Sequence, residues 1–348
     1  MMFSMGAQRV RAAGGGSEIP PPAPTPGVYL ANDPAISYSD CSAPSFVNGW
    51  ARFVRPMDDS GGGLGPNYRY CMPGARQRFR SNAPLVQVQL RWNGLVTRAD
   101  ARNLIGHVFV NGAFVQDFQT PAPINTVTTA TVPINMGSSA DRLYEIILPY
   151  GDGVEFGLVQ VDPAYTVTAA APRTGRVMVN LGDSITQGFW STDTRRAWWF
   201  LLAQSKGFRT INMGSGGRLT VSDDGTAAAN LAPDLITVLL GTNDYLNQIP
   251  VATYKANLKQ LLININAISP SVPVYISAPI PTTQTRPIPF SDYAVVAGQC
   301  IAELGYSQLH GVNNGTLITD TATQLLDGVH PNDAGSVQTA AGWGAAIV

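Results

Sequence analysis

Charged residues are scarce in this chain of 348 residues: they make up 13%, with 22 Lys and Arg against 23 Asp and Glu. No stretch is basic enough to neutralise a row of phosphates, so we expect no nucleic-acid partner. No apolar run approaches the roughly 18 residues that a membrane-spanning helix needs, so no membrane span is expected. Nothing in the sequence sets the oligomeric state.

The N-terminus also lacks an apolar core of signal-peptide length. We therefore expect either a cytoplasmic protein or one that is exported or released by another route. Cysteine is rare as well: there are only three, and no CxxC motif or His/Cys cluster indicates a metal site or another cofactor. Cys41 and Cys71 could pair in a disulfide or remain free thiols, and the sequence leaves both possibilities open.

What is present changes character along the chain. Residues 1–26 are expected to form a flexible segment, since residues 14–26 are rich in Gly and Pro. Residues 27–170 hold short stretches of Val, Phe, Tyr and Thr between turn-forming residues, which predicts a jelly-roll-like all-β sandwich. Asn111-Gly112 is a strong hairpin signal. The strands are expected at Val47–Val54, Gln77–Ser81, Leu85–Trp92, Gly106–Phe118, Asn125–Ile134, Leu143–Leu148 and Val154–Val161.

Residues 176–348 alternate instead between apolar strands and helical stretches, after a short linker at Ala169–Gly175. This order predicts an α/β fold with a doubly wound parallel sheet. Its strands are expected at Arg176–Leu181, Arg209–Met213, Leu235–Leu240 and Val274–Ser277, with Leu317–Ile318 in a short last strand or its lead-in loop. Its helices are expected at Arg195–Lys206, Val251–Ile268, Asp292–Leu304 and Ala334–Ala346.

Small polar motifs follow the strands of this predicted sheet. The carboxyl ends of parallel strands meet at one edge, and the binding site of such a fold lies there. We therefore expect the motifs to share one site. In chain order they are Gly182-Asp183-Ser184, Asn212–Gly217, Gly241–Asp244 and Asp327–His330.

Ser184 follows the first strand on the turn into a helix, where an α/β fold exposes a nucleophile. A serine hydroxyl needs an adjacent base, and His330 can accept and return a proton near neutral pH. Asp327 lies three residues before this histidine, so its carboxylate can reach the second ring nitrogen and fix the tautomer. We expect Asp183 and Asp244 to hold their loops in place.

Together, the motifs GDSIT, NMGSGG, GTND and D-x-x-H resemble those of the SGNH (GDSL-type) hydrolase superfamily, in its order, over residues 177–333. The resemblance implies a flavodoxin-like sheet and an esterase or acyl-hydrolase mechanism through an acyl-enzyme. It also implies three donors to the oxyanion. These are the backbone N–H groups of Ser184 and Gly217 and the side-chain amide of Asn243, with Gly216 and Gly214 as rivals of Gly217.

The predicted site has aromatic neighbours, and the second half of the chain has no long apolar lid. Trp190 and Tyr245 lie near the motifs in sequence and could contact a sugar ring. A sandwich ahead of an SGNH hydrolase also resembles the layout of carbohydrate esterase family two. We therefore expect a serine esterase that removes acetyl or other short acyl groups from a saccharide. The alternatives are a general short-chain esterase, lysophospholipase or thioesterase, and a glycan-binding module with a vestigial hydrolase half.

Overall fold

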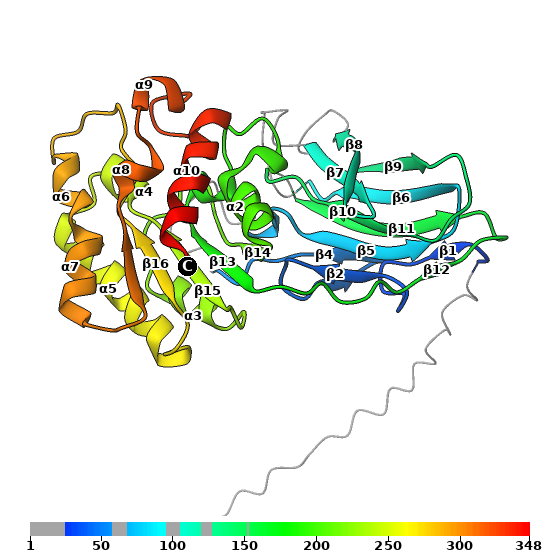
Figure 1. The fold of residues 1–348 in the computed structure, drawn as a ribbon. Helices are drawn as coiled ribbons and strands as arrows, with labels where there is room; N and C mark the ends of the chain where they lie inside the picture. Colours follow the sequence, from blue (N-terminus) through cyan, green and yellow to red (C-terminus); the bar gives the residue numbers. More distant parts are fainter. Residues whose placement is uncertain (1–24, 58–67, 95–104, 120–126, 152) are drawn as a thin grey trace, which may run out of the picture.

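The computed structural model describes residues 25–57, 68–94, 105–119, 127–151 and 153–348. Two lobes follow one another along the chain, an antiparallel β-sandwich and then a parallel sheet covered by helices (Figure 1). This confirms the predicted fold class. The domain boundaries at residues 170 and 176 stay a prediction, although the described strands of the sandwich all precede them and those of the parallel sheet follow them. The predicted flexible segment lies almost entirely outside the described residues.

In the described residues, the sandwich consists of two antiparallel sheets of six strands each. One sheet contains β1 (Val28–Tyr29), β3 (Ser45–Val47), β4 (Trp50–Arg52), β6 (Leu85–Trp92), β9 (Thr128–Asn135) and β11 (Val154–Val161). The other contains β2 (Ser37–Ser39), β5 (Arg76–Ser81), β7 (Ile105–Val110), β8 (Ala113–Gln119), β10 (Arg142–Ile147) and β12 (Val167–Thr168). The strand orders are β3-β4-β11-β6-β9, with β1 beside β11, and β12-β5-β10-β7-β8, with β2 beside β5.

Alternation of apolar and polar residues builds the sandwich core. Along β6, Val86, Val88 and Leu90 are fully buried, as their period of two predicts. Successive side chains of a strand point to opposite faces, so one face of each sheet turns its apolar residues inward. The rings of Phe79 in β5 and Tyr144 in β10 stack in this core with their centroids 5.2 Å apart.

Two Asn-Gly pairs turn the chain back on itself. Asn111 and Gly112 join β7 to β8 with φ values of 51° and 80°, as expected for a tight hairpin. Asn48 and Gly49 do the same between β3 and β4, with φ values of 52° and 83°. The prediction of one strand over Val47–Val54 is therefore wrong, because this second turn divides it.

The parallel sheet contains β13 (Val177–Gly182), β14 (Arg209–Asn212), β15 (Leu235–Leu239), β16 (Val274–Ser277) and β17 (Leu309–Val312). Its order is β14-β13-β15-β16-β17, which is the flavodoxin-like 2-1-3-4-5 arrangement. All five residues of β15 are buried, as its unbroken apolar run predicts. The last strand is not at Leu317–Ile318. It is β17, an edge strand whose exposed His310 and Gly311 hide the apolar pattern.

Helices cover both faces of this sheet (Figure 1). The sequence predicted α5 at its observed bounds and located α10 to within one residue. Two other predicted helices are interrupted, and α3, α4, α8 and α9 were not predicted. The helices are α1 (Ser184–Gln187), the 3-10 turn η3 (Thr194–Arg196), α2 (Trp198–Lys206), α3 (Asp223–Ala229), α4 (Thr242–Leu246), α5 (Val251–Ile268), α6 (Phe290–Ala294), α7 (Val296–Leu304), α8 (Asn314–Leu317), α9 (Thr321–Gln324) and α10 (Asp333–Ala346).

The three cysteines are free thiols, so Cys41 and Cys71 do not form the disulfide that the sequence left open. Cys71 is fully buried, and its thiol donates to the carbonyl oxygen of Tyr150 at 3.1 Å. Within the described residues, no helix combines the length and the apolar character needed to cross a bilayer.

Candidate active site

Ser184 begins α1, directly beyond the carboxyl end of β13. The side chain of Asp183 caps this helix by accepting a hydrogen bond from the N–H of Ile185 at 2.9 Å. Gly182 is required at the strand end, because a Cβ there would lie 2.0 Å from the hydroxyl oxygen of Thr186. Strand, cap and helix therefore fix the direction of the serine side chain, which is 8% exposed.

The structure brings together the three residues expected to perform the chemistry. The hydroxyl Oγ of Ser184 lies 2.7 Å from Nε2 of His330, although 146 positions separate them in sequence. Nδ1 of the same ring lies 2.7 Å from Oδ2 of Asp327. A histidine that donates from Nδ1 to a carboxylate keeps Nε2 free to accept the serine proton.

Asp327 accepts hydrogen bonds from four donors. Its Oδ1 accepts the N–H groups of Val329 at 3.0 Å and His330 at 2.8 Å, which shapes the turn that carries the histidine. Its Oδ2 accepts the indole N–H of Trp190 at 2.9 Å in addition to the His330 ring. Partial burial alone would raise the pKa of this carboxyl, but the hydrogen bonds from His330 outweigh it and lower the pKa below its ordinary range.

Two unused backbone donors lie in the loops around Ser184. In the second motif, the N–H of Gly214 donates to Asn212 and that of Gly216 donates to Gln187, at 2.7 and 2.9 Å. Within the described part of the chain, the N–H groups of Ser184 and Gly217 donate no hydrogen bond. This pattern favours Gly217 over its two rivals as an oxyanion donor. Its φ of 73° also suits glycine.

The third predicted donor is Asn243 at the start of α4. One N–H of its side-chain amide donates to the carbonyl oxygen of Arg218 at 3.1 Å. Since Arg218 directly follows Gly217, this bond ties the amide to the loop that carries the free backbone N–H. An amide has two N–H donors, so the second remains for a ligand.

Gln187 joins this site to the sandwich, and sequence reasoning missed it. The side chain is fully buried in the short α1. Its Nε2 donates to the carbonyl oxygen of Tyr150, in the sandwich lobe, at 2.7 Å. Its Oε1 accepts the N–H of Gly216 at 2.9 Å. One amide therefore links the first lobe to the loop that contains Gly217; the sequence signal for it is a polar residue three positions after Ser184.

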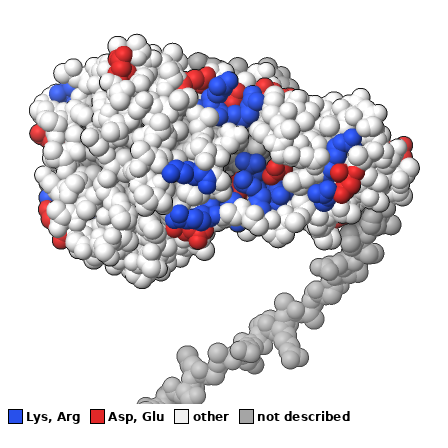
Figure 2. Space-filling view, in the orientation of Figure 1, with Lys and Arg blue, Asp and Glu red and all other residues white. Residues whose placement is uncertain are grey.

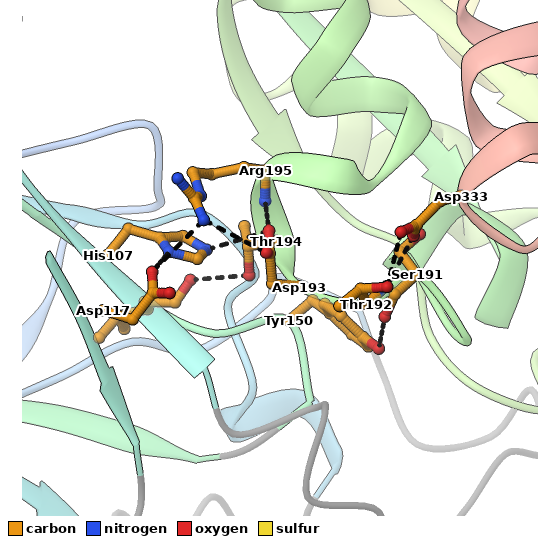
Figure 3. Close-up of polar contacts among 10 residues, drawn as sticks. His107, Asp117, Tyr150, Ser191, Thr192, Asp193, Thr194, Arg195 and Asp333 are labelled. Carbon is orange, nitrogen blue, oxygen red and sulfur yellow. Dashed lines mark hydrogen bonds and ion pairs between the residues drawn. The ribbon is translucent and has the colours of Figure 1, made fainter. Parts of the chain in front are cut away.

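The loop of residues 189–195 is held from both sides (Figure 3). From the sandwich, the hydroxyl of Tyr150 donates to the carbonyl oxygen of Ser191 at 2.6 Å. From the N-terminal end of α10, Asp333 accepts the N–H of Thr192 at 2.8 Å and its hydroxyl at 2.6 Å. These contacts fix the segment that presents Trp190 to Asp327. His107 of the sandwich is buried nearby, with Nδ1 at 2.7 Å from Asp117.

Asp183 and Asp244 were expected to hold their loops in place, and the contacts of both side chains fit that role. Asp244 is buried and accepts the N–H and hydroxyl of Thr220 at 3.1 and 2.9 Å. Asp183 is fully buried, and burial raises the pKa of its carboxyl to about 7. Its cap to Ile185 uses only one oxygen, which a neutral side chain supplies equally well.

Replacing Asp183 with asparagine should therefore stabilise the protein relative to wild type, increasingly as pH rises. Because the folded pKa exceeds the unfolded value, ionisation costs folding free energy that starts near pH 4 and grows until about pH 7. The amide oxygen of the asparagine would keep the cap, and its neutral side chain would remove that cost. The measurement is the difference in Tm between variant and wild type at pH 5 and pH 8. A difference that does not grow with pH would contradict this interpretation.

The two aromatic residues predicted near the substrate differ in their surroundings. Trp190 is half-buried, at a φ of 68°, beside Asp327 and His330, so it lies at the site. Tyr245 is only 2% exposed, and its hydroxyl donates to the carbonyl oxygen of Gln284 at 2.6 Å. The prediction that Tyr245 contacts substrate is therefore wrong. Its ring packs in the core because α4 turns it away from the neighbouring Asn243.

The sequence also matches a known family. Residues 181–337 match the model of the GDSL-like Lipase/Acylhydrolase family, a range that contains all four motifs. Among curated proteins, none matches the chain. The family match and the fold support an acyl esterase or acyltransferase of the SGNH type.

Solved structures share the fold of both lobes. A salicylyl-acyltransferase, SsfX3, from a tetracycline biosynthetic pathway is 18% identical with a TM-score of 0.75, covering 91% of this chain and 95% of that one. A family two carbohydrate esterase from Cellvibrio japonicus is 15% identical with a TM-score of 0.66, covering 91% and 96%. An acetyl xylan esterase from the rumen bacterium Butyrivibrio proteoclasticus is 11% identical with a TM-score of 0.62, over the same shares. At these identities the similarity shows the fold.

Proposed function

From the SGNH-type hydrolase fold, with its family match over residues 181–337, we propose that this protein is a serine esterase that removes acetyl or other short acyl groups from a carbohydrate. The observation that supports it is the hydrogen-bonded series Ser184–His330–Asp327, with 2.7 Å at each step. The unused N–H groups of Ser184 and Gly217 lie in the loops that surround it.

In the proposed reaction, Ser184 Oγ attacks the ester carbonyl carbon while its proton passes to Nε2 of His330. The carbonyl oxygen becomes an oxyanion, which the N–H groups of Ser184 and Gly217 and the amide of Asn243 stabilise. The C–O bond to the sugar then breaks, and His330 returns the proton to the departing hydroxyl. Water repeats the sequence on the acyl-serine and releases the acid. Asp327 stays ionised and holds the imidazole.

Support for a carbohydrate substrate comes from the surroundings of His330 and from the structural relatives. The Phe189 ring lies 5.1 Å from the His330 ring, with Trp190 next to it, so two aromatic side chains border the site. Aromatic faces suit the apolar faces of sugar rings. Two of the three relatives named above are carbohydrate esterases with the same two lobes.

The test is acetate release from acetylated xylan and cello-oligosaccharides, together with a chain-length series of nitrophenyl esters. We expect the acetyl ester to be the fastest of the series and an acetylated saccharide to release acetate. Faster cleavage of long acyl esters would instead indicate a lysophospholipase or thioesterase. Activity on short nitrophenyl esters without release from any saccharide would indicate a general short-chain esterase.

A second candidate is acyl transfer, which the likeness to a salicylyl-acyltransferase over both lobes favours. The same acyl-serine would form, but an alcohol would attack it in place of water. Adding a range of alcohol acceptors to the esterase assay and separating the products distinguishes the two. New esters formed at acceptor concentrations far below that of water would favour transfer over hydrolysis.

The Gln187 side chain bridges Tyr150 and Gly216, and removing this bridge should lower kcat. In the Gln187→Met variant, Gly216 loses the acceptor that holds its loop, and the carbonyl oxygen of Tyr150 loses a donor. A displacement of about 1 Å at a catalytic group can cost about 100-fold in rate, so we expect kcat to fall about 10- to 100-fold with KM little changed. Gln187 would then be a positioning residue.

The matched control is Gln299→Met, since Gln299 is exposed on α7. Circular dichroism and Tm separate a displaced loop from an unfolded protein. If Gln187→Met stays folded and retains wild-type kcat, the bridge does not position the oxyanion donors.

A further inference from the structure

A cavity of about 250 Å³ lies at the waist between the two lobes. The sandwich contributes Arg76, Phe109 and Glu145 to its wall, and the second lobe contributes Phe200 and Phe208. Arg173, from the segment that joins the lobes, completes it. Both charge and apolar surface therefore line one small space.

Arginine exceeds acid around this cavity. Asp40 is buried and forms ion pairs with three arginines: Arg173, Arg76 at 2.8 Å and Arg209 at 3.6 Å. Glu145 pairs with Arg76 at 3.6 Å and with a fourth guanidinium, that of Arg78, at 3.1 Å.

Four positive charges thus meet two negative ones, and among the described residues these guanidinium groups have no other acidic partner. Figure 2 shows Lys and Arg gathered at this waist between the lobes.

Part of this positive charge is buried away from water, where it is costly. Arg76 has a side chain that is 11% exposed. Burial lowers the pKa of its guanidinium, the charge of Asp40 raises it, and the charge of Arg173 lowers it. Asp40 already pairs with both arginines, and a further negative group in the cavity that they line would add to this compensation. A carboxylate suits guanidinium N–H groups best, because it can accept two parallel hydrogen bonds.

The other residues that line the cavity indicate what kind of molecule would bear this carboxylate. Phe200 and Phe208 are buried, with 5% and 8% of their surface exposed, and Phe109 is half-buried. Aromatic walls favour a flat apolar body, and the volume is below the roughly 300 Å³ at which pockets for drug-sized ligands begin. Glu145 would repel a second negative charge. We propose that the waist cavity binds a small monocarboxylate with a flat apolar body, such as an aromatic acid.

This site is separate from Ser184. The helix α2 begins near the serine, where the indole N–H of Trp198 donates to the carbonyl oxygen of Ile185 at 3.1 Å. The waist cavity is lined from Phe200 to Phe208, along this helix and just beyond it, and none of its lining residues belongs to the four motifs around Ser184. The proposal therefore does not rest on the proposed esterase activity.

The experiment is isothermal titration calorimetry of the full chain at pH 7 and low salt, with sodium benzoate as the probe. Acetate, sulfate and benzyl alcohol test the carboxylate, the charge alone and the apolar body alone. We expect saturable binding of benzoate, with each of the other three at least about tenfold weaker. Equal binding of sulfate would overturn the assignment to a carboxylate with an apolar body.

Two variants locate the binding. Arg173→Gln removes one guanidinium, and Gln204→Trp places a bulky ring at an exposed position on the cavity wall. Each should weaken benzoate binding at least about tenfold. The control Arg80→Gln lies on the same strand as Arg76 but pairs with the exposed Asp141, and it should bind normally. Ser184→Ala should also bind normally. No saturable binding, or loss in Ser184→Ala alone, would overturn the proposal.

Discussion

Replacing Ser184 with alanine should lower kcat for ester hydrolysis by at least about 10⁴-fold, with KM much less affected. In serine hydrolases that work through the same three groups, removal of the nucleophile costs about 10⁶-fold in kcat. The residual rate comes from the oxyanion donors and from substrate binding, which the variant keeps. The fold should persist, because among the described residues the Ser184 side chain hydrogen-bonds to His330 alone, and it is only 8% exposed.

Two measurements check the role of Ser184. Steady-state kinetics on nitrophenyl acetate give the loss in kcat, with Ser205→Ala on the exposed side of α2 as the control. Mass spectrometry after treatment with a phosphonate ester shows which serine becomes labelled. Retention of more than about 1% of wild-type kcat, or a label on another residue, would refute Ser184 as nucleophile. Absence of any hydrolysis in the wild type would instead favour a binding module with a vestigial hydrolase half.

Local patterns were enough to predict much of the fold. The strands β6, β11 and β16 and the helix α5 have the predicted bounds, because each combines a clear period or apolar run with turn residues at its ends. Prediction was wrong where an element has no such pattern. The edge strand β17 exposes two of its four residues, and the helix predicted over Arg195–Lys206 starts at Trp198 after a 3-10 turn.

The residues of the site were likewise predicted only in part. The motifs placed Ser184, Asn243 and His330 at strand ends because a parallel sheet brings those ends together. Contacts between distant segments could not be predicted from them. Gln187 meets Tyr150 across the two lobes, and Trp190 meets Asp327 across 137 positions. Such pairs depend on how the lobes and loops pack, which no local pattern in one sequence records.

Replacing Asp327 with asparagine should also cause a large loss of kcat, and the contacts of Asp327 with its neighbours, Trp190 among them, explain why. Asp327 Oδ1 already accepts two backbone N–H groups, so an asparagine would keep its carbonyl oxygen there. Its NH₂ group would then face the His330 ring and the Trp190 indole, both of which donate to the carboxylate in wild type. The imidazole could meet that NH₂ only with its proton on Nε2, and Nε2 could no longer accept the proton of Ser184.

We therefore expect kcat to fall about 10⁴-fold in Asp327→Asn, the size of loss that a forced wrong tautomer produces in a serine triad. The control Trp190→Phe removes one donor to the carboxylate and leaves the His330 tautomer unchanged, so its loss should be far smaller. Proton NMR separates the two variants, since a downfield Nδ1–H signal from His330 should disappear in Asp327→Asn and persist in Trp190→Phe. Because a purely structural role for Asp327 would not move that proton, a persistent signal with a full loss of kcat would contradict the tautomer explanation.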